Sequence, residues 1–396
     1  MTEPVRISRW SCPLGESQYA RLGAGDAIEI YGRVQPQAGV TGIEAQAASI
    51  YACLRGLLKQ HGLDPGDVLT ERLFFADIDA HAEPVRRVRA DFYQDSADLP
   101  ASTFLQQPPG AEGQLLELQV YIVRSQLHHV VVMPGLPSAT AGRLVSAPGQ
   151  THIYLQNLVA DDDLRGVDFR GQCRRLFERL RGVLADHDLP VSQLIRTWIY
   201  LRDLETDYDA LNEVRNDCFA EWGVTRLPAS TGIEGAPHPT GCRISADVCI
   251  LWGDSLGEIE LMHGETLGEA AEYGSAFSRG LRVQHADRTV LFVSGTASID
   301  VAGNVVHVGD IEGQCHRMLD NVDALLRPHG AVLADTVNAV TYLKERAFVP
   351  VFERVCRERG VSTDLLNTVV VADVCRPDWL CEIELTAVLP SQGVAP

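Results

Sequence analysis

The most chemically suggestive segment of the chain is CEIEL, a strand-like run near its end that holds two glutamates. Glu382 and Glu384 stand two residues apart, so on a β-strand both side chains point to the same face. They are either solvent-facing strand residues or candidates for general acid catalysis, for which a carboxyl group with a pKa raised by burial is well suited. Cys375 stands seven residues before Glu382 and is either a small buried thiol or part of the same site.

Other catalytic and metal-binding patterns are missing from the sequence. It contains no GxSxG, no P-loop, no GxGxxG leading into a helix and no HExxH. Its ten cysteines include no CxxC pair and no paired Cys/His ligand spacing, which predicts no metal site and a reducing compartment. The formal net charge of −19 disfavours a nucleic-acid partner, because phosphate backbones would be repelled.

Three segments of the chain align with one another without a gap, which indicates an internal repeat. Each opens with a glutamine, has a histidine fifteen residues later and an aromatic residue twenty-eight residues later. The segments are Gln46 to Asp77, Gln172 to Asp203 and Gln314 to Glu345; the histidines are His61, His187 and His329; the aromatic residues are Phe74, Tyr200 and Tyr342. The histidines follow the apolar helix pattern and are expected at helix C-termini, in a structural role.

Each copy predicts one α/β unit. Apolar residues first recur at helical spacing and then form a β-type run, a second helix follows, and a strand pair precedes the first helix, clearest in Thr289 to Ile299. The sequence therefore predicts a mixed α/β (α+β) fold of three tandem ββαβαβ units at 1–127, 128–262 and 263–396. The acidic stretch Gly253 to Glu269 marks the second boundary, either as a solvated linker or as the entry to the third unit.

The repeated unit resembles the RidA (YjgF) family. The resemblance rests on the glutamine-initiated helix, the ALNEVRNDCF helix and the closing EIE strand, and it extends over nearly the whole chain. It implies the chorismate-mutase-like fold of that family and an intramolecular version of its trimer, with clefts between neighbouring units. RidA proteins hydrolyse enamines and imines and hold the substrate carboxylate with one arginine, but Ser102, Ser230 and Asn367 stand at that position here. The substitution disfavours this activity, since neither side chain supplies a bidentate cation.

The third copy resembles the C-terminal half of chorismatases, which release pyruvate from chorismate. The matching segments are FVSGTASID (Phe292 to Asp300), VHVGDIEGQ (Val306 to Gln314) and ADVCRPDWLCEIE (Ala372 to Glu384). This resemblance implies that Glu382 is the general acid, with Cys375 as a second catalytic residue. Cysteine at 375 together with glycine at 295 resembles the subgroup that makes 3-hydroxybenzoate.

A substrate with two carboxylates needs cations around it. The candidate substrate-binding residues are Arg376, Arg279, Arg243, Tyr342, Lys344, Gly295 and Thr296. Each cation could instead be a surface salt-bridge partner, and Tyr342 could belong to the core.

We therefore expect an enzyme without a cofactor that releases pyruvate from chorismate and gives 3-hydroxybenzoate for secondary metabolism. The alternatives are an enamine or imine hydrolase and a non-catalytic binding homologue. A small-molecule substrate is expected, with no membrane partner. The sequence has no apolar run long enough for a span or a signal peptide, so we expect a cytoplasmic protein. Because the internal trimer would close itself, we also expect a monomer with internal pseudo-threefold symmetry.

Overall fold

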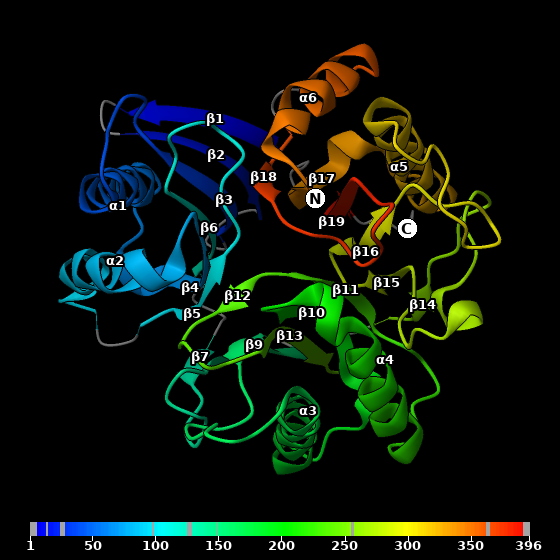
Figure 1. The fold of residues 1–396 in the computed structure, drawn as a ribbon. Coiled ribbons are helices and arrows are strands. Elements are labelled where there is room, and N and C mark those ends of the chain that lie inside the picture. Colours follow the sequence, from blue (N-terminus) through cyan, green and yellow to red (C-terminus); the bar gives the residue numbers. More distant parts are fainter. Residues whose placement is uncertain are drawn as a thin grey trace, which may run out of the picture.

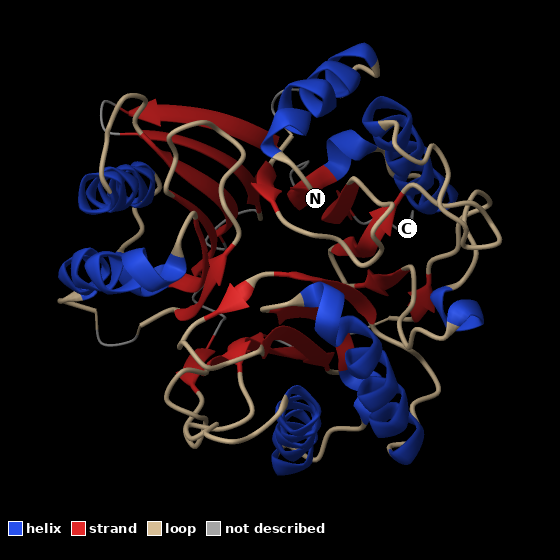
Figure 2. Ribbon diagram, in the orientation of Figure 1, coloured by secondary structure: helices blue, strands red, loops and turns tan. Residues whose placement is uncertain are grey.

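The structure of the chain is a computed structural model that describes residues 6–12, 15–23, 28–96, 99–124, 129–147, 149–254, 257–361 and 365–390. Its strands form three sheets, one for each predicted unit (Figure 1). Helices lie on the outside and the sheets face one another across the centre (Figure 2). The predicted mixed α/β fold of three successive units is confirmed.

The first unit supplies six strands of a seven-stranded sheet and two helices that pack against each other. Its elements are β1 (Arg6–Cys12), β2 (Gly15–Leu22), β3 (Ile28–Pro36), α1 (Ile43–Gln60), β4 (Val68–Phe75), α2 (Ile78–Tyr93), β5 (Ala101–Gln106) and β6 (Leu116–Arg124). The sheet order is β1-β2-β3-β6-β4-β5, followed by the short β12 (Ala236–Pro237) of the second unit.

The second unit forms a six-stranded sheet in the order β11-β10-β13-β9-β8-β7. These elements are β7 (His129–Val132), β8 (Ala141–Ala147), β9 (Gln150–Leu158), α3 (Phe169–Asp186), β10 (Leu194–Leu201), α4 (Leu204–Glu221), β11 (Ala229–Glu234) and β13 (Ile244–Trp252). His61 and His187 are the C-cap residues of α1 and α3, the position expected for the repeated histidines.

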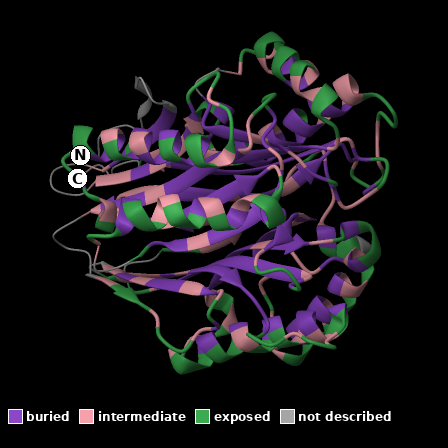
Figure 3. Ribbon diagram, turned by 60° about the vertical axis from the view of Figure 1, so that its left-hand side comes forward, coloured by how far each residue is buried: buried purple, intermediate pink, exposed green. Residues whose placement is uncertain are grey.

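The third unit repeats the pattern in the order β14-β15-β16-β19-β17-β18. It consists of β14 (Ile259–Leu261), β15 (Gly280–Gln284), β16 (Arg288–Ala297), α5 (Ile311–Leu326), β17 (Thr336–Leu343), α6 (Val349–Glu358), β18 (Asn367–Val371) and β19 (Cys381–Pro390). Buried residues follow the strands and the inner sides of the helices, and exposed residues lie on the outer helix faces (Figure 3).

The repeated glutamine has the same structural task in all three units. Gln314 is buried in the first turn of α5, donates to the carbonyl groups of His307 and Asp378, and accepts from the backbone N–H of Leu380. Gln46 and Gln172 make the matching bonds in their own units. In each unit the glutamine therefore links the first turn of the unit's first helix to the residues that directly precede the closing strand.

The structure differs from the predicted elements in two places. The segments 100–103 and 228–231, which both read PAST, and the third-unit counterpart at Asn367 begin the additional strands β5, β11 and β18. These strands run parallel to β4, β10 and β17. Thr289 to Ile299 does not hold both strands of a pair, because β16 runs through most of it and pairs with the preceding β15. The pairing of β16 with β19 shifts between Val293 and Thr296, so Ser294 and Gly295 form a β-bulge inside one strand. The expected strand pair would have required a turn in this segment.

The predicted domain boundaries stay a proposal. β6 ends at Arg124 and β7 begins at His129, on either side of the first boundary. β14 lies within the acidic stretch Gly253 to Glu269 and pairs with β15, so this part of the stretch belongs to the third sheet.

Candidate functional site

A cavity of ≈ 220 Å³ lies between the second and third units. The second unit contributes side chains from α4 and β11, and the third unit contributes the bulge of β16, the segment 275–279 and the chain from residue 375 to the start of β19. The predicted residues Glu382, Cys375, Arg376, Arg279 and Gly295 all line it. Residues more than a hundred positions apart in the sequence are therefore brought together.

Glu382 is a buried carboxyl group that faces this cavity. Only 3% of the residue is exposed, and its Oε2 makes no hydrogen bond to any residue that the structure describes. Burial raises the pKa of Glu382 to about 8, and the negative charge of Glu384 adds to this rise, while Arg279 and Arg196 oppose it. The side chain is therefore mostly protonated at neutral pH and can donate a proton.

Gly295 makes room for this carboxyl group. A Cβ atom at position 295 would lie 2.0 Å from Glu382 Oε1. The bulge in β16 also directs the Gly295 backbone N–H to Thr231 Oγ1, at 3.0 Å, across the boundary between the units. The glycine predicted from the sequence is thus required by the position of the acid.

Glu384, the alternative acid, has the opposite environment. It pairs with Arg196 of the second unit at 2.7 Å and lies 3.7 Å from Arg72 of the first unit. Its carboxyl group is thus ion-paired with guanidinium groups of two other units. The two glutamates of β19 therefore differ, because Glu384 is ion-paired whereas Glu382 is a buried carboxyl group with a raised pKa.

The first unit holds an internal counterpart of Glu382. Strand pairing places Glu117 opposite Phe74 and Glu382 opposite Tyr342, and the two aromatic residues occupy the same position of the repeat. Glu117 is fully buried, but Arg33 forms an ion pair with it and Gln35 donates to it at 2.9 Å. A buried glutamate at this position is therefore ion-paired with an arginine in the first unit, whereas in the third unit burial raises its pKa.

Cys375 is a thiol in this site. Its Sγ donates a hydrogen bond to the carbonyl oxygen of Gly232 at 2.9 Å. Burial raises the pKa of the Cys375 thiol well above its usual range, and the nearby Glu382 adds to the rise. The cysteine can shape the cavity and donate a hydrogen bond, but its environment does not favour the thiolate needed for nucleophilic attack.

Three arginines give the cavity a positive wall. Arg279 donates to the Gly268 carbonyl at 2.7 Å and Arg376 to the Gly303 carbonyl at 2.6 Å, so both are held in place by backbone oxygens of the third unit. The third, Arg215, comes from α4 of the second unit and lies over the Phe277 ring, 5.5 Å from its centroid. Guanidinium groups in a buried cavity favour a ligand with carboxylate groups.

Four other predicted residues lie outside the cavity. Arg243 pairs with Asp207 at 2.8 Å, and Lys344 donates to the Pro377 carbonyl at 2.9 Å. Tyr342 is fully buried in the third unit's core, and Thr296 donates to the Ser294 carbonyl within its own strand.

The sequence analysis did not select any residue of the second unit as part of this cavity, although seven line it: Tyr208, Asp209, Asn212, Arg215, Ser230, Thr231 and Gly232. It also missed lining residues of the third unit such as Phe277 and Trp379. The ALNEVRNDCF helix, which contains Asn212 and Arg215, was noted only for its family resemblance. However, only the packing of the units shows that they face Glu382.

A separate group of possible metal ligands lies on the outer helices. Ligand atoms of Glu312, His316 and Glu358 lie within 4.8 Å of one another on α5 and α6, and all three side chains are partly or largely exposed. The group is on the opposite side of the sheet from Glu382 and adds nothing to the cavity. Among the described residues, no helix is both long and apolar enough to span a membrane.

Comparisons with known proteins agree with both resemblances noted in the sequence. Residues 271–389 match the family described as Endoribonuclease L-PSP, the RidA family. Chorismatases from Streptomyces rapamycinicus and Streptomyces hygroscopicus are 29% and 30% identical over 214 and 219 residues, which is 48% of this chain in both cases. The matches span 63% and 60% of those relatives, so about two fifths of their length has no matched counterpart here.

A solved chorismatase structure shows the same fold. It superposes on 81% of this chain and 93% of its own, with a TM-score of 0.61 and 21% identity. The 3-aminoacrylate deaminase RutC of Acinetobacter baylyi is 29% identical over 98 residues, covering 25% of this chain and 78% of the relative. The chain is thus similar in sequence to chorismatases over about half of its length and to a 3-aminoacrylate deaminase over a quarter.

Proposed function

We propose that the chain is a chorismatase-like enzyme that releases pyruvate from chorismate without a cofactor, with Glu382 as the general acid. The observation that carries the proposal is a buried, protonated carboxyl group facing a cavity with three arginines. The sequence similarity to two chorismatases supports the same substrate. A cavity of ≈ 220 Å³ is below the range of about 300–1,000 Å³ typical of drug-sized ligands, which suits a compact metabolite.

The proposed reaction begins at the enolpyruvyl ether of chorismate. Glu382 gives its proton to the methylene carbon, whose double-bond electrons form the new C–H bond, and the positive charge appears on the ether carbon. The resulting Glu382 carboxylate stabilises this cation. Water then attacks the ether carbon to form a hemiketal and returns a proton to Glu382. The bond between this carbon and the ether oxygen then breaks, and the proton of the hemiketal hydroxyl group moves to the ether oxygen. Pyruvate is released and the ether oxygen stays on the ring as a hydroxyl group.

The arginines orient the substrate for this step. Chorismate carries one carboxylate on the ring and one on the enolpyruvyl group. We propose that Arg279 and Arg376 of the third unit and Arg215 of the second bind these two groups. Because the arginines come from both units, the substrate lies across the boundary between them.

The proposed aromatic product is 3-hydroxybenzoate. Its formation requires that the ring also loses a hydroxyl group and a ring proton as water, so chorismate gives pyruvate and 3-hydroxybenzoate with no net water consumed. Cys375 and Gly295 shape the cavity next to Glu382, and Cys375 is held by the Gly232 carbonyl. We propose that this pair decides between the aromatic product and simple hydrolysis.

A single assay tests the proposal. The purified protein is incubated with chorismate, pyruvate release is followed, and the ring products are separated by chromatography. We expect pyruvate above the spontaneous rate and a loss of at least about 100-fold in Glu382→Gln, which keeps the shape but cannot donate the proton. Glu117→Gln, the same substitution at the equivalent position of the first unit, is the matched control and should retain pyruvate release.

Other outcomes would point to the alternatives. Ammonia release from freshly generated 2-aminoacrylate, with no pyruvate from chorismate, would support the enamine hydrolase. The RutC relative is named as a deaminase of the isomer 3-aminoacrylate. If Glu382→Gln retains full activity, the acid is another residue. If neither substrate turns over, the protein is a binding homologue and the proposed function is wrong.

A further inference from the structure

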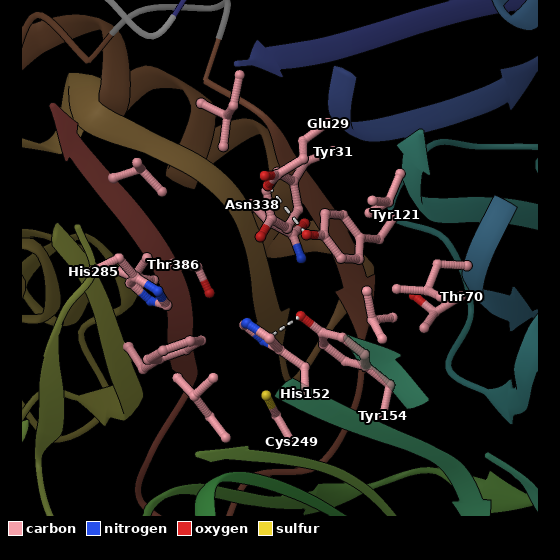
Figure 4. Close-up of a pocket in the computed structure, with 18 of the residues that line it drawn as sticks. Glu29, Tyr31, Thr70, Tyr121, His152, Tyr154, Cys249, His285, Asn338 and Thr386 are labelled. Atoms are coloured by element: carbon pink, nitrogen blue, oxygen red, sulfur yellow. Dashed lines mark hydrogen bonds between the residues drawn. The ribbon is translucent and has the colours of Figure 1, made fainter. Parts of the chain in front are cut away.

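A second and larger cavity, of ≈ 490 Å³, lies on the central axis where the three sheets face one another. Side chains from all three units line it, and Figure 4 shows lining residues around an open space. Glu382, Cys375, Arg279 and Arg376 do not line it, so the proposed reaction makes no use of it.

The cavity is built from equivalent positions of the three units that have diverged in chemistry. Tyr121, Cys249 and Thr386 occupy the same position on the three closing strands. Their strand partners are Tyr31, Tyr154 and Phe292. Cysteine and threonine at two of the three closing-strand positions leave the axis open where larger apolar residues would fill it. A pseudo-symmetric ring with three different walls can bind a molecule that has no threefold symmetry.

One wall of the cavity is aromatic. Tyr31 and Tyr121 stack with ring centroids 4.5 Å apart, Tyr121 lies 5.7 Å from Tyr154, and Tyr154 stacks on His152 at 5.8 Å and 13°. Figure 4 shows Tyr121 and Tyr154 on one side of the open space and His285 and Thr386 on the other. A continuous aromatic wall favours a flat ring as the ligand.

The cavity also offers uncharged hydrogen-bonding groups. The amide of Asn338 and the hydroxyl groups of Thr70 and Thr386 face the open space (Figure 4). His285 Nδ1 lies 2.7 Å from Gln150 Oε1; because that oxygen can only accept, Nδ1 carries the proton and Nε2 is left as an acceptor. Burial lowers the pKa of His285 to about 4, so its ring stays neutral near pH 7.

The charges around the cavity disfavour an anion. Arg288 is 3.0 Å from Glu29 and 2.8 Å from Asp287. Arg72, the other lining arginine, is bound by Asp247 at 3.0 Å and lies near Glu384. Glu384 also pairs with Arg196, so these four carboxylates face three guanidinium groups. An incoming carboxylate would therefore meet net negative surroundings.

We propose that the axial cavity is a second small-molecule site, and that it binds an uncharged, flat aromatic molecule with a hydroxyl group, that is, a ligand of the phenol class. The ring packs on the aromatic wall of Tyr121, Tyr154 and His152. The hydroxyl group donates to a neutral imidazole or amide acceptor on the lining.

Calorimetric titration with 4-methylphenol tests the proposal on the full chain. We expect saturable 1:1 binding, at least tenfold weaker binding of the non-planar 4-methylcyclohexanol, and at least tenfold weaker binding of the anionic 4-methylbenzoate. Cys249→Phe and Thr386→Phe, which fill the cavity from two different units, should each abolish binding. Val301→Phe adds the same side chain at a residue that is 59% exposed and should change nothing.

The two cavities are separated by one further variant. Glu382→Gln alters the smaller cavity and should leave 4-methylphenol affinity unchanged, so failure of the chorismate assay does not affect this test. Thermal unfolding of each variant shows whether it is folded, and a second filling variant is available if one is not. The proposal is overturned if 4-methylphenol does not bind, if both folded filling variants still bind it, or if 4-methylbenzoate binds as tightly. An axial cavity that holds only water would give no binding of 4-methylphenol.

Discussion

At the scale of single residues, the candidate active site depends on one carboxyl group that its surroundings keep protonated. Glu382 and Glu117 stand at equivalent positions, yet among the described residues Glu117 forms an ion pair with an arginine and Glu382 does not. Glu384, two residues away, is ion-paired with Arg196 and Arg72. The three glutamates therefore differ in their surroundings rather than in residue type, and burial raises the pKa of Glu382.

The first prediction concerns pH. The acid must be protonated to work, and the pKa of Glu382 is raised to about 8. The value of kcat/KM for pyruvate release should therefore be flat near neutral pH and fall about tenfold per pH unit above about pH 8. Initial rates with chorismate across this range measure the alkaline limb, and a rate that rises above pH 8 would contradict the assignment.

Glu384→Gln sharpens the same test. The charge of Glu384 raises the pKa of Glu382, so removing it lowers that pKa and exposes Glu382 more strongly to Arg196. The fall of kcat/KM at alkaline pH should therefore begin at a lower pH than in the wild type, even if the maximal kcat/KM also changes. A limb that stays in place or moves upward would show that Glu384 does not act on the catalytic proton.

A second prediction concerns Gly295. An added methyl group would occupy the position of Glu382 Oε1, so in Gly295→Ala the flexible glutamate must move. We expect kcat to fall by about 10- to 100-fold, since displacing a catalytic group by about 1 Å has effects of that size. Gly182→Ala is the control, because nothing lies within 4 Å of that site in α3, and it should retain activity. Wild-type kcat in Gly295→Ala would mean that the carboxyl group acts from another position.

At the scale of elements, β19 and the bulge of β16 place the acid, and a repeated glutamine holds the start of β19. Gln314 joins the first turn of α5 to Leu380, which directly precedes β19. The same arrangement holds β6 and β13 in the other units. The repeat therefore carries a structural residue whose effect on catalysis depends on the unit in which it lies.

The third prediction uses this repetition. Gln314→Leu leaves buried backbone groups without their partners and should lower the free energy of unfolding by about 2–4 kcal/mol. It should also lower kcat, because the start of β19 positions Glu382. Gln46→Leu should cost similar stability in the first unit but leave kcat unchanged. Urea unfolding and pyruvate release are measured on both variants; an equal loss of kcat in the two would refute a specific role for β19.

At the scale of the whole molecule, three covalently joined units enclose two different kinds of cavity. The smaller one lies between the second and third units, and the larger one lies on the axis of all three. Arg72 of the first unit lines the axial cavity and approaches Glu384 of the third unit, so each unit contributes to the environment of the candidate active site. One chain can therefore assign different chemistry to its clefts, because its copies need not stay identical.

The fourth prediction is the oligomeric state. The three sheets already face one another within one chain, so their inner faces need no second copy for burial (Figure 2). Light scattering should give a mass near that of the 43.3 kDa chain. A stable trimer of chains in solution would contradict the prediction.

The sequence by itself determined the repeat, the fold of each unit and one side of the candidate site. Helical and strand periodicity are local properties, so the α/β units could be predicted from spacing alone. Glu382, Cys375, Arg376 and the bulge around Gly295 belong to a single unit, within which the repeat and the resemblance to known families selected them. The prediction of a strand pair in Thr289 to Ile299 was wrong because small residues such as Ser294 and Gly295 are found both in β-bulges and in turns.

Only the tertiary structure decided which unit completes the site. Arg215 and Tyr208 face Glu382 because the second unit packs beside the third, whereas Arg243 and Lys344, equally plausible as isolated cations, pair with groups outside the cavity. The pKa of Glu382 likewise depends on burial between units and on Arg196, an arginine of the second unit that is distant in the sequence. Such properties arise from contacts between distant surfaces, and no local pattern of residues encodes them.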